Sequence, residues 1–316
     1  MRTFPSVETI LSLLRNHRLR GKLFALVAAG SVLAAFPTGA QTLDECTLWA
    51  ATGNVVEGGG TLIAKNRDWL PDHQQRLSLF TPANGFAYFG LVALGTEAES
   101  RGLKAGINQY GLVVINASAS AIPQKVRIAM PHTSRLMTRI LSGCQNVDQA
   151  LTHMEWFLGP EFLMLADKKK VAVIEIGPEG KTAVSLVENG TASHTNQFLD
   201  AALIANNSFG SQTRVRELPS STSRLARIRD LVARKSFGLN LKDFVGWSLD
   251  QSDGPDNSIW RTGSTTQAER TLASWIVYLP SDGKPVLFVR LANPGHERQE
   301  LMLSPADIFT AGKYTP

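Results

Sequence analysis

The chain has 316 residues, of which 43% are hydrophobic and 19% charged, and this ordinary globular composition excludes disordered, collagen-like and coiled-coil classes. Its formal charge of +5 comes from 32 basic and 27 acidic side chains without a concentrated basic stripe, so we predict no nucleic-acid partner. The two cysteines, Cys46 and Cys144, are too few for a disulfide-dense scaffold or a multi-cysteine zinc site.

The N-terminal sequence has the pattern of an export signal. A basic run, Arg15–Lys22, precedes the apolar run Leu23–Phe36, which is shorter than the roughly 20 residues that a membrane-spanning helix needs. The small residues of Thr38–Ala40 then fit a signal-peptidase site. We therefore predict a signal peptide at 1–40 and a periplasmic or secreted protein with no membrane attachment after its removal. An uncleaved N-terminal membrane anchor is the alternative.

Strands joined by short turns dominate the chain from Cys46 onward. Single strands are predicted at Phe86–Leu94 and Leu112–Ser118, with a turn-rich segment at Ala105–Gly111 before the second. Asn189-Gly190 is typical of a two-residue hairpin turn. The predicted hairpins are Leu48–Val56 with Thr61–Lys65, Glu161–Ala166 with Val171–Ile176, Thr182–Glu188 with Thr191–Thr195, and Trp275–Leu279 with Val286–Leu291.

Helical periodicity appears between these hairpins. The predicted helices are Leu136–Leu141, Val147–Leu158 behind a capping pair at Asn146 and Gln149, Arg224–Arg234, and Leu241–Leu249. We interpret the Ser/Thr-rich run Ser208–Ser223 as a surface loop. Because hairpins imply antiparallel pairing, the expected fold class is α+β, with antiparallel sheets covered by helices in a single domain at 46–316.

Several common catalytic and cofactor motifs are missing from the sequence. It has no P-loop, no dinucleotide-binding glycine pattern, no H-E-x-x-H, no C-x-x-C and no G-x-S-x-G. The six histidines are scattered along the chain, which gives no support to a histidine metal cluster. We therefore predict no metal and no cofactor.

The sharpest feature is Cys46 followed, some twenty residues later, by the polar cluster Lys65–Asp68. A cysteine at the first position of a mature chain has a nucleophilic thiol and an α-amine, with an unperturbed pKa near 8, that can accept its proton. Such a site also needs an acid to hold the amine, a cation beside the thiol and donors for the oxyanion. Residues 41–45 would then be a short propeptide that is removed after the signal peptide.

At these residues the chain resembles the choloylglycine hydrolase and penicillin V acylase group of N-terminal-nucleophile (Ntn) hydrolases, and the related acyl-coenzyme A:6-aminopenicillanic acid acyltransferases. The resemblance covers essentially all of 46–316 and implies an αββα sandwich of two antiparallel sheets between helical layers. It also implies a homo-oligomer, which is common for this fold. The matching motifs are Cys46-Thr47, Lys65–Trp69, Gly106–Leu112, His194–Phe198 and Ser223-Arg224.

The resemblance assigns roles to particular residues of this chain. Cys46 becomes the nucleophile, Asp68 the acid that binds its α-amine, Asn196 an oxyanion donor, and Arg224 a polar residue that organises the site. The cation is an arginine in the bile-salt and penicillin enzymes but Lys65 here, which supplies charge without a bidentate fork.

Two of these assignments have alternatives. The adjacent Arg67 can replace Lys65 as the active-site cation, although we favour Lys65. The second oxyanion donor lies on the strand after the Gly-Leu turn, where Asn116 and Ser118 both fit, and Asn116 is our prediction.

The implied function is an exported amidohydrolase that activates itself and cleaves linear, non-peptide C–N amide bonds in a small acylated substrate. Bile-salt conjugates, penicillin V and N-acyl homoserine lactones are all compatible with the resemblance. An acyltransferase, in which an amine rather than water resolves the thioester on Cys46, is the close alternative. A secreted binding protein without catalysis, held by a Cys46–Cys144 disulfide, is an alternative from another class.

Overall fold

The computed structural model describes residues 45–95, 101–205 and 218–315. The predicted signal peptide and residues 41–44 of the predicted propeptide lie outside these described residues, whereas Glu45 lies within them. All the described residues belong to one unit, Thr42–Pro316.

The first of two antiparallel sheets holds the N-terminal strand of the described chain. Its register sets Cys46 opposite Arg67 on one side and Leu48 opposite His194 on the other. The sheet has the strand order β10-β1-β2-β11-β12-β13, with β1 (Cys46–Thr52), β2 (Thr61–Trp69), β10 (Gly190–His194), β11 (Arg270–Leu279), β12 (Val286–Leu291) and β13 (Gln299–Leu303).

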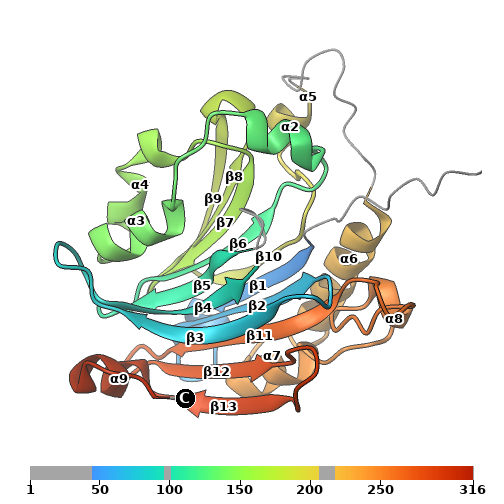
Figure 1. The fold of residues 1–316 in the computed structure, drawn as a ribbon. Helices are drawn as coiled ribbons and strands as arrows, with labels where there is room; N and C mark the ends of the chain where they lie inside the picture. Colours follow the sequence, from blue (N-terminus) through green and yellow to red (C-terminus); the bar gives the residue numbers. More distant parts are fainter. Residues whose placement is uncertain (1–44, 96–100, 206–217, 316) are drawn as a thin grey trace, which may run out of the picture. The chain divides into compact units, whose positions relative to one another are not determined.

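The second sheet follows the chain order from strand to strand, because each strand pairs with the next through a hairpin or a longer connection. It contains β3 (Gln74–Phe80), β4 (Tyr88–Leu94), β5 (Gly102–Asn108), β6 (Val113–Ser118), β7 (Glu161–Ala166), β8 (Val171–Ile176) and β9 (Thr182–Val187). The two sheets lie face to face (Figure 1) and enclose the main core, to which Leu48, Phe89 and Trp275 contribute fully buried side chains.

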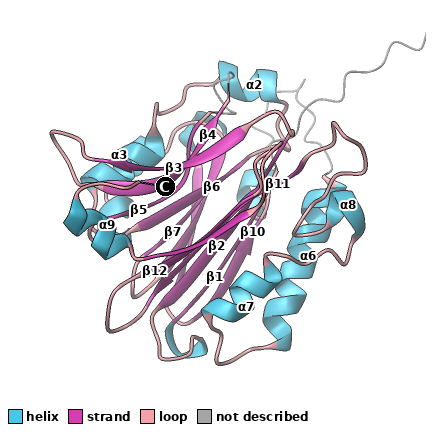
Figure 2. Cartoon of the chain, turned by 60° about the horizontal axis from the view of Figure 1, so that its bottom comes forward, coloured by secondary structure: helices cyan, strands magenta, loops and turns pink. Residues whose placement is uncertain are grey.

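Helices cover the outer face of each sheet, as Figures 1 and 2 show. On the first sheet, alternate residues of β1 such as Trp49 pack against Ile228 and Phe244 of the covering helices, so both faces of this strand are buried. The helices are α2 (Gln124–Ala129), α3 (Leu136–Gly143), α4 (Val147–Leu151), α5 (Ala201–Ala205), α6 (Pro219–Arg234), α7 (Leu241–Trp247), α8 (Gly254–Asn257) and α9 (Pro305–Ala311), with 3-10 turns at Gly53–Val55, Met154–Trp156 and Pro178–Gly180. The expected αββα sandwich is confirmed.

Several local predictions need correction. The segment predicted as turn-rich at Ala105–Gly111 is the end of strand β5 as far as Asn108, and the turn itself is confined to the residues that follow. The helix predicted at Val147–Leu158 ends at Leu151, and a separate 3-10 turn stacks Trp156 on the ring of His153. The Asn146 cap is confirmed, since its side chain accepts from the Gln149 N–H.

The helix predicted at Arg224–Arg234 begins earlier than expected. The helix starts at Pro219. Proline is favoured in the first turn because a backbone N–H there has no acceptor within the helix, so no hydrogen bond is lost when proline lacks one. The end of the predicted loop Ser208–Ser223 is therefore helical, while 208–217 lies outside the described residues.

Candidate active site

Cys46 is the first residue of β1, and its backbone is held by two of the predicted site residues. Its N–H donates to Asn196 Oδ1 over 2.8 Å, and its carbonyl accepts from Arg224 Nη1 over 2.6 Å. Asn196 reaches this position because it follows β10, the neighbour of β1 in the sheet. Its Nδ2 donates to the carbonyl of Ser118 over 3.0 Å. The structure thus brings Cys46, Asn196 and Arg224 together.

Arg224 is a fully buried guanidinium at the centre of this cluster. Besides the Cys46 carbonyl, it donates to Thr47 Oγ1 over 2.9 Å, to Glu45 Oε2 over 3.1 Å and to Asn196 Oδ1 over 3.2 Å. Its Nε also donates to Ser220 Oγ over 3.3 Å. The buried guanidinium thus holds Cys46 by its carbonyl and Glu45 by its carboxylate, on either side of the peptide bond that joins them. The geometry fits the organising role that the resemblance assigns to Arg224.

Glu45, Arg261 and Glu269 form a part of the site that the sequence analysis missed. The Glu45 carboxylate is 2% exposed and accepts from Arg261 Nη1 over 2.8 Å as well as from Arg224. Arg261 Nη1 also donates to Glu269 Oε2 over 2.8 Å. Burial raises the pKa of Glu269 to about 8, although Arg261 acts to lower it. No local signal marks these residues, because Arg261 lies more than two hundred positions from Glu45.

Asp68 approaches the same peptide bond from β2. Its backbone N–H donates to the Glu45 carbonyl over 3.1 Å, and its Oδ1 accepts from Thr271 Oγ1 over 2.8 Å. No described residue donates a hydrogen bond to its buried Oδ2, which lies 4.0 Å from Arg224 Nη1. Burial raises the pKa of Asp68, and the nearby arginines only partly oppose this shift. In the uncleaved chain, the Cys46 N–H therefore has Asn196 as its partner, and Asp68 keeps one acceptor oxygen available.

Lys65 and Asn116 form a second buried pair that connects the two sheets. Lys65 Nζ donates to the backbone oxygen of Asn116 over 2.5 Å and to its Oδ1 over 2.7 Å. Asn116 Nδ2 donates in turn to Glu161 Oε1 over 2.6 Å. Lys65 thus connects β2, the neighbour of β1, to β6, the strand that carries the predicted second oxyanion donor Asn116.

Arg67, the alternative to Lys65, occupies the register position opposite Cys46. Its Nη1 donates to the Asp68 carbonyl over 2.6 Å, and its guanidinium lies 4.6 Å from the centre of the Trp69 ring. Ser118, the alternative to Asn116, contributes a backbone carbonyl to Asn196. Both cations are therefore bonded to a predicted site residue, Lys65 to Asn116 and Arg67 to the backbone of Asp68.

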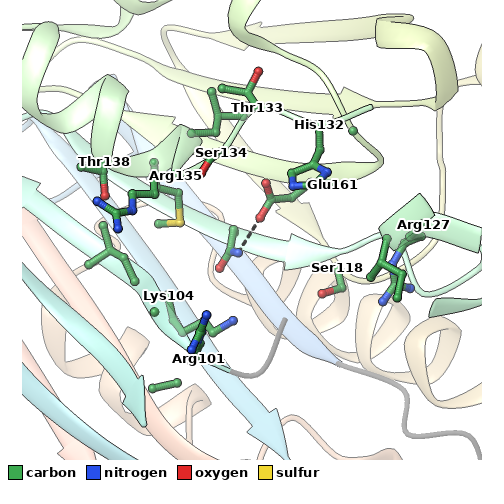
Figure 3. Close-up of a pocket in the computed structure, with 18 of the residues that line it drawn as sticks. Arg101, Lys104, Ser118, Arg127, His132, Thr133, Ser134, Arg135, Thr138 and Glu161 are labelled. Carbon is green, nitrogen blue, oxygen red and sulfur yellow. Dashed lines mark hydrogen bonds between the residues drawn. The ribbon is translucent and has the colours of Figure 1, made fainter. Parts of the chain in front are cut away.

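A cavity of about 1000 Å³ opens where strands β5 and β6 separate. Only Ala105–Ile107 of β5 pair with Val113–Ile115 of β6. Beyond these pairs both strands line the cavity, β5 through Lys104 and β6 through Asn116 and Ser118. Figure 3 shows the lining side chains around this space. The cavity therefore meets the Lys65–Asn116 pair, and it supplies room for a small-molecule substrate.

Cys144 lies apart from this site. Both cysteines are free thiols, and Cys144 packs in the core between α3 and the second sheet, whereas Cys46 belongs to the core between the sheets. The Cys46–Cys144 disulfide of the binding-protein alternative is not formed in this structure.

The buried Cys144 thiol is expected to resist alkylation. Burial raises its pKa to about 11, so only about one molecule in a thousand is a thiolate at pH 8. Iodoacetamide treatment of the native protein, followed by peptide mass analysis, should leave Cys144 unmodified, and unfolding in denaturant should expose it. Rapid labelling of Cys144 in the native protein would contradict its buried position. A Cys144→Ala variant should keep its enzymatic activity.

Two further findings concern the described residues only. They contain no group of three or more His, Cys, Asp or Glu side chains arranged to hold a metal ion. Their helices are all too short or too polar to cross a membrane.

Comparisons with known proteins place this arrangement in a family. Two similar solved structures are variants of the conjugated bile acid hydrolase from Clostridium perfringens. Each is 13% identical and covers 82% of this chain and 92% of its own, with TM-scores of 0.51 and 0.49. At this identity the first of them supports a common fold, that of the Ntn hydrolases. No curated protein matches the chain. A family model described as acyl-coenzyme A:6-aminopenicillanic acid acyl-transferase matches residues 55–294. The chain therefore belongs to the acyl-coenzyme A:6-aminopenicillanic acid acyl-transferase family and has an Ntn-hydrolase fold.

Proposed function

We propose that the protein is an exported cysteine amidohydrolase that cleaves linear, non-peptide C–N amide bonds through a thioester on Cys46. The observation that carries the proposal is the set of groups around the Glu45–Cys46 bond. Asn196 accepts from the nitrogen, Arg224 holds the following carbonyl, and Asp68 Oδ2 is a buried acceptor to which none of the described residues donates. These groups suit an α-amine that does not yet exist in the uncleaved chain.

The same groups support self-activation. In the uncleaved chain, the Asp68 N–H already donates to the Glu45 carbonyl, which is the carbonyl that the Cys46 thiol would attack. This hydrogen bond polarises the carbonyl and stabilises the negative charge that develops on its oxygen. Attack forms the S–C bond and transfers the Glu45 acyl group from nitrogen to sulfur, and the nitrogen takes up the thiol proton. Water then hydrolyses the thioester and leaves Cys46 as the first residue.

Turnover of a substrate would repeat these steps with the new α-amine as the base. The amine accepts the thiol proton, the thiolate attacks the amide carbonyl, and the protonated amine then donates to the leaving nitrogen. Asp68 and Asn196 would hold the amine, and Arg224 would keep β1 in place. Lys65 supplies positive charge on the strand next to Cys46. Water finally releases the acid from the thioester.

Acyl transfer is the second candidate, and the family match favours it. In this reaction an amine takes the place of water and receives the acyl group from the Cys46 thioester. Both reactions use the same nucleophile and differ only in the group that attacks the intermediate. They can therefore be separated only by the acceptor that reacts.

A substrate panel tests these two candidates. We expect the mature protein to release amine from at least one member of a panel of conjugated bile salts, penicillin V and N-acyl homoserine lactones. If all of these fail while an acyl thioester donor transfers its acyl group to an added amine, the transferase assignment replaces hydrolysis. Mass spectrometry of the products distinguishes free acid from new amide, and a Cys46→Ala variant is the blank.

A further inference from the structure

The Glu45 side chain is held in a buried site of its own, one residue before the candidate nucleophile. Its Oε2 accepts from Arg224 Nη2 over 3.1 Å and from Arg261 Nη1 over 2.8 Å. All three residues are buried. A carboxylate that two guanidinium groups share makes strong and specific contacts, because donor and acceptor are both charged and little water competes with them. The fold thus contains a built site for one acidic side chain.

The segment before β11 fixes Arg261 in this position. The Arg261 N–H donates to Thr271 Oγ1 over 2.8 Å, and its carbonyl accepts from the Thr271 N–H over 3.0 Å. The Thr271 hydroxyl donates in turn to Asp68 Oδ1 over 2.8 Å. Arg261 therefore belongs to the same hydrogen-bonded frame as Asp68, whose N–H donates to the Glu45 carbonyl.

Glu269, the second carboxyl group bonded to Arg261, does not replace Glu45 in this site. It accepts from Arg261 Nη1 over 2.8 Å, whereas Arg224 donates to Glu45. Burial raises the pKa of Glu269 to about 8, so this carboxyl group is mostly protonated at pH 7. Because a buried guanidinium without a charged partner is costly, the carboxylate that both arginines share matters most for them. In the uncleaved chain this carboxylate is Glu45.

Glu45 is consequently held at both of its ends. The Asp68 N–H donates to its backbone carbonyl over 3.1 Å, while the two arginines bind its carboxylate. Arg224 also donates to the Cys46 carbonyl over 2.6 Å, so one guanidinium connects the Glu45 side chain to the residue that carries the nucleophile. Attachment at two points restricts rotation of the Glu45 carbonyl, and restricting the reacting groups in this way accelerates an intramolecular attack.

We propose that Arg261, together with Arg224, recognises the carboxylate of Glu45 and thereby positions the Glu45–Cys46 bond for self-cleavage. The proposal rests on the self-activation in the proposed function and names the side chain that this reaction selects. Arg261 is a positioning residue, since it contacts the departing segment rather than the reacting atoms. Rapid maturation should therefore require a carboxylate on a side chain of glutamate length at position 45.

Cell-free synthesis of the full chain from purified translation components, without signal peptidase, tests this recognition. After translation is stopped, intact-mass analysis follows the fraction of chains that begin at Cys46. We expect Glu45→Gln and Arg261→Gln each to slow this cleavage by at least about tenfold. Glu45→Asp should have a smaller effect, because it keeps the charge. The control, Arg229→Gln, removes an exposed arginine from the helix that carries Arg224 and should stay within about twofold of the wild type.

Three measurements distinguish recognition from a general loss of folding. Every Glu45 variant releases the same mature chain as the wild type, so its cleaved fraction should have the wild-type kcat/KM. Resistance of Cys144 to iodoacetamide shows that the uncleaved fraction is folded. Because Glu45 and Arg261 act as a pair, the double variant Glu45→Gln/Arg261→Gln should be cleaved no more slowly than the slower single variant.

The outcomes separate this proposal from the proposed function. Recognition of Glu45 is overturned, while self-activation stands, if Glu45→Gln is cleaved as fast as the wild type or if the two single effects multiply in the double variant. Slow cleavage accompanied by labelling of Cys144 in all these variants reflects unfolding and also overturns it. If wild-type chains stay uncleaved, or Cys46→Ala chains are cleaved, the protein does not activate itself, and the proposed self-activation is wrong as well.

Discussion

The Cys46→Ala variant is expected to keep Gln41–Glu45 and to lose all amidase activity. Intact-mass analysis of the wild-type protein should show a chain that begins at Cys46, whereas the variant lacks the thiol that attacks the Glu45 carbonyl. The Asp68 N–H and Arg224 would still hold the scissile peptide in the variant, because both contacts involve backbone atoms of Glu45 and Cys46. Retention of residues 41–45 in the variant alone would therefore show that the Cys46 thiol is needed for their removal.

Cys144→Ala is the control for this experiment. Its thiol packs in a different core, so the variant should be processed and active like the wild type. If Cys46→Ala is trimmed to the same length as the wild type, an external peptidase removes the propeptide. If the wild type begins stably at Gln41 and still hydrolyses amides, the α-amine has no part in the mechanism.

The Asp68→Asn variant should lose activity without losing stability. An asparagine can still accept from the Thr271 hydroxyl, but it has no charge to hold the α-ammonium, and we expect kcat/KM to fall by about 100-fold or more. Burial raises the pKa of Asp68 above its unfolded value, so the folded state binds the proton more tightly. The folded state therefore loses stability as the pH rises from the unfolded pKa through the folded pKa of this carboxyl group. At neutral pH the substitution should therefore leave the uncleaved chain equally or more stable.

Urea unfolding at pH 7 checks the stability, with Asp68→Asn made in the Cys46→Ala background so that both proteins stay uncleaved. Asp230→Asn, which removes a carboxylate paired with Arg227 on the surface of α6, should leave kcat/KM unchanged. A large loss of stability in the Asp68 variant would mean that the buried carboxylate is ionised and paired in the folded chain. Full activity of this variant would remove Asp68 from the mechanism.

Much of the strand arrangement could be predicted because the hairpins depend on local sequence. The β1–β2 and β7–β8 pairs are examples, since the two strands of each pair are close together in the sequence. The hairpin predicted around Asn189-Gly190 is wrong, because β9 pairs with β8 in the second sheet whereas β10 pairs with β1 in the first. Strand β5 was missed because its glycines suggest turns. Gly106 is there for packing instead, since a Cβ at this position would lie 2.6 Å from Leu141 Cδ1. The turn-forming glycine is Gly111, with φ +88°.

The candidate site could be predicted only where short motifs resemble known enzymes. Asn196 and Arg224 lie within such motifs, and the structure brings both to the Cys46 backbone. Arg261 and Glu269 could not be predicted, because nothing in the surrounding sequence indicates that they reach Glu45. Their position depends on how the segment before β11 folds back over the sheet, and this is set by tertiary packing rather than by a local pattern.

The Glu45 carboxylate also bears on whether the proposed cleavage can run backwards. Its negative charge is one of the influences that raise the pKa of both Asp68 and Glu269. When Glu45 departs, that influence disappears and a basic nitrogen is created beside them, so both carboxyl groups become easier to ionise. The ionised Asp68 then stabilises the new ammonium group, and rejoining the peptide would require this ion pair to be lost. Proton redistribution inside the protein would thus oppose the reverse reaction.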